Sequence, residues 1–259
     1  MQQGDLTLHV EGVSRLHAIH PFNKLAYILL TGCIVYCAPG GWRPDAIILG
    51  LNLGIGAISG VLPHIGKFSL RMLLPLALFM LPIHGFLQPE NHTPLLSVHG
   101  VVLYQEGVEF AGTVLLQLAA VLTASLLFVF TTHPGDIIAS LTQAGWPPFA
   151  AYLLGGPLLM LPAMRARIGI IQAAQRSRGL DSEGSLIKRA RSLGPLVIPL
   201  VLGAFAEIDQ RAIALELRGF TLPGKHTSLR VVNDSRLQRT LRWLLLFASL
   251  SLVVSSILL

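Results

Sequence analysis

A glycine and a lysine in the last fifth of the chain have the spacing of a phosphate-binding loop. In the stretch GFTLPGKHT, Gly219 is followed by four residues and then by Gly224 and Lys225. The motif requires Ser or Thr next, because that hydroxyl binds the nucleotide's Mg²⁺, but His226 occupies this position. Such a loop also follows a strand, whereas a helical pattern precedes it here. Gly219 therefore needs another explanation.

Gly219 belongs to a short internal repeat. The segments IQAAQRSRGL and RAIALELRGF end 40 residues apart and share an alanine, an arginine and a glycine at equal offsets. The shared pairs are Ala174 and Ala214, Arg178 and Arg218, and Gly179 and Gly219. Each segment has the pattern of a last helical turn, which glycine closes and whose negative dipole end favours arginine.

One such ending is a common helix cap, but two identical endings suggest two equivalent docking points. Arginine forms charge-assisted, often bidentate bonds to carboxylates, so a helix end that carries it fits an acidic groove of a partner. The repeat therefore indicates two similar partners, or one two-fold symmetric pair.

Other residues that could do chemistry form no recognisable site. His84, His92 and His99 match no compact metal-ligand spacing. Cys33 and Cys37 lie one helical turn apart in an apolar run and are interpreted as packing residues. No Ser/His/Asp set or carboxylate pair stands in a catalytic context. The chain is therefore predicted to be non-catalytic, with no metal and no cofactor of its own.

The composition predicts a membrane protein. Of 259 residues, 53% are hydrophobic and 12% are charged, and the mean hydropathy is +0.65. This charge is about half that of an ordinary soluble domain, so a lipid bilayer is the expected solvent. A span needs roughly 20 largely apolar residues. We predict spans in Leu25–Trp42, Ala46–Gly66, Met72–Pro89, Phe110–Phe130 and Trp243–Leu259, and we expect Pro39, Gly40 and Gly41 to end the first helix early.

The pattern changes between the fourth and the last of these runs. Ile137–Met164 is interrupted by prolines, and Ser192–Ala206 is too short to span. In Val201–Phe220 apolar residues recur every three or four positions, with Glu207, Arg211 and Arg218 on another face. We therefore predict an all-α polytopic protein with about five transmembrane helices and long amphipathic helices. The expected regions are 1–132 (N-terminal transmembrane helices), 133–235 (amphipathic helices) and 236–259 (C-terminal transmembrane helix).

The basic residues predict the orientation. Of the 19 Lys and Arg residues, 14 lie between Arg165 and Arg242. By the positive-inside rule, the N-terminus and the amphipathic region are cytoplasmic in a multi-pass protein of the cell (inner) membrane. The net charge of +6 is then a consequence of topology, so no nucleic acid is expected as a partner.

With these motifs, most of the sequence resembles the transmembrane T component of energy-coupling factor (ECF) transporters, the CbiQ-like group. The resemblance is strongest from Thr131 to Phe220 and weak over the first three spans. It is carried by HPFNKL (20–25), TTHPGDIIASLTQAGWP (131–147), IQAAQRSRG and IALELRG. The chain has Ser177 and Leu217 where alanine often precedes the arginine in that family.

The resemblance implies roles for the two endings. Arg178 and Arg218 would dock on two ATP-binding-cassette (ABC-type) ATPases, as the ends of cytoplasmic coupling helices. Gly179 and Gly219 would close these helices, and the alanines would pack beside the arginines. The partner ATPases would bind ATP and Mg²⁺.

The resemblance also implies that apolar faces of the coupling helices hold a membrane-embedded, substrate-binding S component and reorient it. The residues expected at this contact are Phe149, Tyr152, Leu158, Leu161, Leu196 and Phe205. The S component would select the transported compound: a vitamin, a vitamin precursor or a transition metal ion. One alternative is an autonomous secondary transporter or channel. It would need polar residues along a pathway, and the four predicted N-terminal spans contain few. The other alternative is a membrane enzyme, but this chain contains no recognisable catalytic set.

Overall fold

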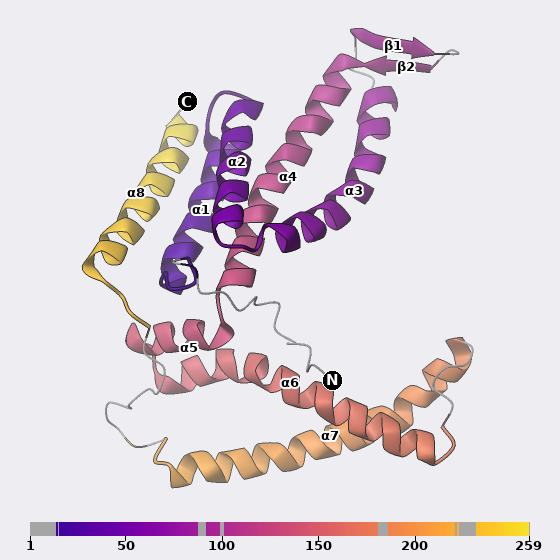
Figure 1. The fold of residues 1–259 in the computed structure, drawn as a ribbon, viewed down its shortest axis with the longest axis vertical. Helices are drawn as coiled ribbons and strands as arrows, with labels where there is room; N and C mark the ends of the chain where they lie inside the picture. The colour runs from indigo at the N-terminus through magenta and orange to yellow at the C-terminus, as the bar shows by residue number, and fades with distance from the viewer. Residues whose placement is uncertain are drawn as a thin grey trace. The chain divides into compact units, whose positions relative to one another are not determined.

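The structure is a computed structural model that describes residues 14, 16–87, 92–98, 101–180, 186–220, 222 and 232–258. Its described elements are helices and one β-hairpin (Figure 1). In chain order they are α1 (Pro21–Cys37), α2 (Trp42–Ile58), α3 (Leu62–Leu87), β1 (Pro94–Val98), β2 (Val101–Tyr104), α4 (Gln105–Thr131), α5 (Pro134–Gln143), α6 (Pro148–Ser177), α7 (Leu186–Leu217) and α8 (Arg236–Leu258). The chain divides into two compact units: 141–231 forms one, and 7–140 with 232–259 forms the other.

The predicted all-α, polytopic membrane fold is confirmed, although the spans differ in detail. Four helical segments in the described part of the chain are long and apolar enough to cross a membrane. They are Leu62–Phe86, Gln105–Thr131, Leu193–Leu217 and Arg236–Leu258. The third of these lies within α7, where the sequence analysis expected a run too short to span. It is longer because the helix continues through the charged residues after Ala206.

α1 ends before Gly40 and Gly41, as predicted, and α2 is shorter than the run expected there. Helices α1 and α2 contain 17 residues each, which is about 25 Å at 1.5 Å per residue. Gly40 and Gly41 between them have φ angles of 122° and 65°, so the backbone turns there in a conformation that glycine adopts without strain. At its other end α1 begins with Pro21, and the His20 ring caps it by accepting a bond from the Phe22 amide (3.3 Å).

The β-hairpin was not predicted. Strands β1 and β2 pair antiparallel between α3 and α4, and the register is irregular between Pro94 and Leu96. The carboxylate of Glu106, in the first turn of α4, accepts hydrogen bonds from the amide and hydroxyl of Thr93. This contact ties β1 to the start of the fourth helix.

The unit formed by 7–140 and 232–258 is a helix bundle. α4 packs against α1, α2 and α3, and α1 packs against α8. A core cluster of Val61, Ile65, Leu127 and Phe130 joins α3 to the end of α4, and the Phe68 ring tilts against that of Phe130. Most apolar side chains of α3 and α8 point out of the bundle and are exposed, as expected for helices whose solvent is lipid.

Polar side chains are buried at the interface of α1, α2 and α4, at two levels. At one end the Lys24 ammonium, 8% exposed, donates to the Thr131 carbonyl (2.8 Å) and to the Thr132 hydroxyl (3.2 Å). Near the middle the Tyr27 hydroxyl donates to Oδ1 of Asn52 (2.6 Å). These residues form no visible pattern in the sequence, because each apolar run contributes only one or two of them.

Asn52 is the centre of this network. Its side chain is fully buried, and its amide nitrogen donates to the Ala120 carbonyl (2.9 Å) and to the Thr123 hydroxyl (3.1 Å) of α4. One side chain of α2 therefore holds both of its neighbours, α1 through Tyr27 and α4 through two bonds.

The HPFNKL motif fixes α1 to α8. The His20 amide donates to the Gln238 side chain (3.2 Å), and the Asn23 side chain donates to the Gln238 carbonyl (2.9 Å). Beside them Arg242 forms an ion pair with Asp234 (3.1 Å). Burial alone would raise the pKa of Asp234, but the hydrogen bond and positive charge of Arg242 lower it below its usual value. The first and last described helices are thus joined at one end of the bundle.

We expect Asn52→Ala to lower the thermal unfolding temperature. The substitution removes one hydrogen-bond partner from each of the Tyr27 hydroxyl, the Ala120 carbonyl and the Thr123 hydroxyl. Loss of such interhelical bonds in a membrane lowers the free energy of unfolding by about 1–2 kcal/mol. Asn233→Ala, at an exposed position, is the matched control. Equal unfolding temperatures of the two variants in the same lipid nanodiscs would contradict the role assigned to Asn52.

Candidate functional site

The unit 141–231 contains both predicted arginine endings, on two long helices that run antiparallel. Three contacts join α6 to α7 along their length: the Gln175 side chain donates to the Pro195 carbonyl (3.0 Å), Arg167 pairs with Glu207 (3.0 Å), and the rings of Tyr152 and Phe220 meet edge to face (5.6 Å). Along these three contacts the residue numbers of α6 decrease while those of α7 increase, as antiparallel pairing requires. Figure 1 shows α6 and α7 as the two long helices of this unit.

This pairing separates the two arginines. Arg178 closes α6 near the level of Pro195, while Arg218 closes α7 at its far end, beside the start of α6. At 1.5 Å per residue, Pro195 and Arg218 are about 35 Å apart along α7. The unit therefore presents the same chemical group at two widely separated points.

Both endings have the same backbone geometry. At the end of α6 the Leu180 amide donates to the Gln175 carbonyl and the Gly179 amide to the Arg176 carbonyl, both at 3.0 Å. At the end of α7 the Phe220 amide donates to Leu215 (3.0 Å) and the Gly219 amide to Glu216 (2.9 Å). Gly179 and Gly219 have φ angles of 86° and 70°. These are two Schellman motifs, in which glycine takes the left-handed conformation directly after the arginine.

The cap geometry alone does not distinguish these ends. α2 and α5 end with the same two hydrogen bonds, closed by Gly60 and Gly145. The residue before the glycine is a serine in α2 and an alanine in α5, whereas it is Arg178 or Arg218 in the other two. The arginine, and not the turn, is therefore what sets the two endings of this unit apart.

Both arginine side chains are exposed, and neither forms an ion pair with another described residue. Ala174 and Ala214, one turn earlier, are also exposed, so they do not pack against the rest of the chain. Gly219 is half-buried, and a Cβ there would lie 2.9 Å from Leu222. The Gly224-Lys225 part of the loop-like stretch lies outside the described residues.

An ion network holds the middle of the helix pair. Glu207, 18% exposed, lies 3.0 Å from Arg167 of α6 and 2.6 Å from Arg211 one turn further along α7. A Cβ on Gly203 would lie 3.3 Å from the Arg167 guanidinium, so this glycine permits the close approach. Glu207 and Arg211 were expected on one face of the helix, but their partner Arg167 was not predicted. The available signal was the apolar surroundings of Glu207, because an acid that is buried there needs a cation.

Glu207 and Arg211 of α7 are turned toward α6, and many apolar residues of α7 face outward. The exposed residues include Ile198, Leu202, Phe205 and Ile213. Of the residues expected at an S component, Phe149 and Phe205 are exposed, Leu196 is half-buried and Tyr152 packs against Phe220. Leu158 and Leu161 lie outside the side chains that the structure describes.

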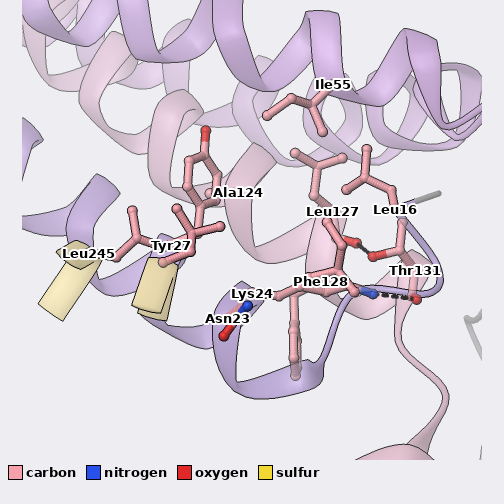
Figure 2. Close-up of a pocket in the computed structure, with 12 residues that line it drawn as sticks. Leu16, Asn23, Lys24, Tyr27, Ile55, Ala124, Leu127, Phe128, Thr131 and Leu245 are labelled. Carbon is pink, nitrogen blue, oxygen red and sulfur yellow. Dashed lines mark hydrogen bonds between the residues drawn. The ribbon is translucent and has the colours of Figure 1, made fainter. Parts of the chain in front are cut away.

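Each unit has a pocket. Between α6 and α7 a cavity of about 270 Å³ is lined by residues that include Tyr152, Met160, Ile208 and Arg211. In the bundle, a pocket of about 240 Å³ lies among α1, α4 and α8 (Figure 2). Lys24 lines it, but its ammonium points at Thr131, so the wall around it is apolar.

Among the described residues, no group of three or more His, Cys, Asp and Glu side chains could hold a metal ion. Of the three histidines considered, His99 lies outside this part of the chain. The His84 ring makes contacts within the bundle instead, with the Met80 carbonyl at 3.1 Å and with the ring of Phe110.

Comparison with known proteins agrees with this architecture. The protein family CbiQ, described as cobalt transport protein, matches residues 12–229. A protein of Brevibacillus brevis named energy-coupling factor transporter transmembrane protein EcfT is 30% identical over 222 residues, which cover 82% of this chain and 83% of the relative. Relatives with the same name are 30% identical over 228 residues in Acidaminococcus fermentans and 27% identical over 251 residues in Ruminiclostridium cellulolyticum.

These matches cover the helix bundle and both arginine-ended helices together. The segment from 12 to 229 includes α1 to α7, and the alignment with the Ruminiclostridium protein covers 90% of each chain. The chain therefore belongs to the CbiQ family and is a transmembrane component of the energy-coupling factor transporter type.

Proposed function

We propose that this chain is the scaffold and energy-coupling subunit of an ATP-driven importer. In this proposal it links two partner ATPases of the ABC type to a membrane-embedded S component that binds the substrate. The observation that carries the proposal is the pair of exposed arginines, which end two helices with identical caps at opposite ends of one antiparallel pair.

The arginines fit two copies of one kind of partner. Each guanidinium projects from a closed helix end and forms no ion pair with a described residue, so it remains available to a carboxylate. The separation of about 35 Å along α7 is too large for one small groove but suits two neighbouring subunits. ATP and Mg²⁺ are bound by these ATPases, and this chain is assigned no cofactor.

The helix pair can transmit movement because it is joined along its length. The contacts of Gln175, Arg167 and Tyr152 with α7 act at the two ends and the middle. When the ATPases approach or separate, the arginine ends are displaced and the pair moves as a connected element. The outward apolar faces, including Phe149 and Phe205, then carry the S component with them.

The remaining functional assignments follow from this role. The N-terminus and the helix pair are on the cytoplasmic side of a multi-pass protein of the inner membrane, because the basic residues concentrate there. α7 has the length of a span, but its segment Leu193–Leu217 carries four charged residues, so we assign it to the membrane surface and not to a crossing. The S component selects the substrate, which is a vitamin, a vitamin precursor or a transition metal ion. An autonomous carrier is less well supported, because the polar atoms of Lys24, Tyr27 and Asn52 are bound to neighbouring groups and do not face a pathway.

We expect Arg178→Ala combined with Arg218→Ala to abolish ATP-driven uptake and to weaken association with the ATPases. The double variant removes both charge-assisted contacts but leaves the glycine caps and the helix pairing intact. The measurement is co-purification with the ATPases and the S component encoded beside this gene, followed by uptake in proteoliposomes.

Arg165→Ala combined with Arg236→Ala is the matched control, because it removes two exposed arginines that belong to neither Arg-Gly ending. The control should keep uptake and complex formation. If the Arg178 and Arg218 double variant kept both as well, the docking role would be excluded. Transport by this chain alone in liposomes would favour the carrier instead.

The ion network is tested by exchanging its charges. Glu207→Arg places a third cation beside Arg167 and Arg211, so α6 and α7 should separate and uptake should fall. Adding Arg167→Glu to this variant restores an opposite pair across the two helices, and uptake should partly recover. If the two substitutions act additively, with no recovery, α6 and α7 are not coupled through this contact.

A further inference from the structure

Asp45 is a carboxylic acid buried in the bundle that has no role in the coupling mechanism. It lies in the first turn of α2 and is 1% exposed. Neither of its carboxyl oxygens has a hydrogen-bond partner among the described residues. A buried group of this kind requires an explanation, because an unpaired polar atom away from water is strongly unfavourable.

The groups of α1 and α4 beside Asp45 are polar but uncharged, and Arg43, two residues before it in α2, is exposed and forms no ion pair with it. The Gln117 side chain of α4 lies beside it, outside hydrogen-bonding geometry, and donates a long bond to the Val35 carbonyl of α1 (3.4 Å). One turn before Val35, the Thr31 hydroxyl is also buried without a described partner. No charged side chain in the described part of α1, α3 or α4 forms an ion pair with the Asp45 carboxyl.

An ionised Asp45 would therefore be a buried negative charge with no counter-charge. The attraction that makes a buried ion pair tolerable is missing, so the desolvation cost would be uncompensated. Binding a metal ion is a poor solution, because Asp45 belongs to no group of three or more His, Cys, Asp and Glu side chains among the described residues. A proton removes the charge and also supplies a hydrogen-bond donor.

We propose that Asp45 is a proton-binding site within the α1–α2–α4 interface and carries its proton at neutral pH. The proton comes from water and binds one carboxyl oxygen, and a small side-chain rotation lets that hydroxyl donate to the amide oxygen of Gln117. Asp45 is then neutral in the folded protein, while Lys24 at the other end of the same interface has two oxygen acceptors. This site does not depend on the proposed coupling function.

The protonation state can be measured directly by solid-state NMR. The protein is labelled with [4-¹³C]aspartate and reconstituted in lipid at neutral pH, and the carboxyl signals of its six aspartates are recorded. We expect one signal at the chemical shift of a neutral acid, which Asp45→Asn removes and which Asp209→Asn, at an exposed position, does not. A wild-type spectrum with only carboxylate signals overturns the proposal, whether or not the variant folds.

Two further observations separate a proton from a cation. The Asp45 signal should be the same in sodium, potassium and choline buffers, and a shift with the cation would overturn the proposal in favour of cation binding. Asparagine has the shape and neutrality of a protonated aspartate, so Asp45→Asn should change the unfolding temperature by no more than about 3 °C. A clearly larger loss would show that the negative charge itself is needed.

Discussion

The structure depends on one constraint: a bilayer offers no hydrogen bonds, so each polar group in it must find a partner within the protein. The backbone meets this requirement by forming helices. The side chains meet it at helix interfaces, where Asn52 joins α1 to α4 and Lys24 reaches the last carbonyl of α4. Asp45 has no such partner among the described residues, and a bound proton would satisfy the same constraint in another way.

The same constraint explains how α6 and α7 distribute their charged and apolar side chains. α6 and α7 place Arg167, Glu207 and Arg211 against one another and leave apolar side chains such as Leu202 and Phe205 outside. In a water-soluble helix pair the reverse arrangement is usual. An inverted pair of this kind suits a helix that lies against lipid or against an apolar membrane partner, with its charges used to hold it to its neighbour.

Much of the fold could be predicted from the sequence, because long apolar runs and the Arg-Gly repeat are local signals. The end of α1 before Gly40 and Gly41 was predicted, but α2 was placed too far along the chain, since the turn at Gly60 ends it. The β-hairpin was missed because its strands have five and four residues. The repeat located the two arginines, but the sequence could not predict the distance between them. That distance follows from the contacts of Gln175 with Pro195 and of Tyr152 with Phe220, which join residues that are distant in sequence.

The bond between α1 and α8 has a consequence for the order of assembly. Asn23 finds its acceptor on Gln238, which follows it by 215 residues, and Lys24 finds Thr131 after 107. During synthesis α1 therefore emerges with polar side chains whose partners have not yet been made. Until α4 and then α8 are inserted, these groups must stay near water or near the insertion machinery. The bundle is complete only when α8 has left the ribosome, and loss of the first turn of α8, which carries Gln238, would leave Asn23 without its acceptor.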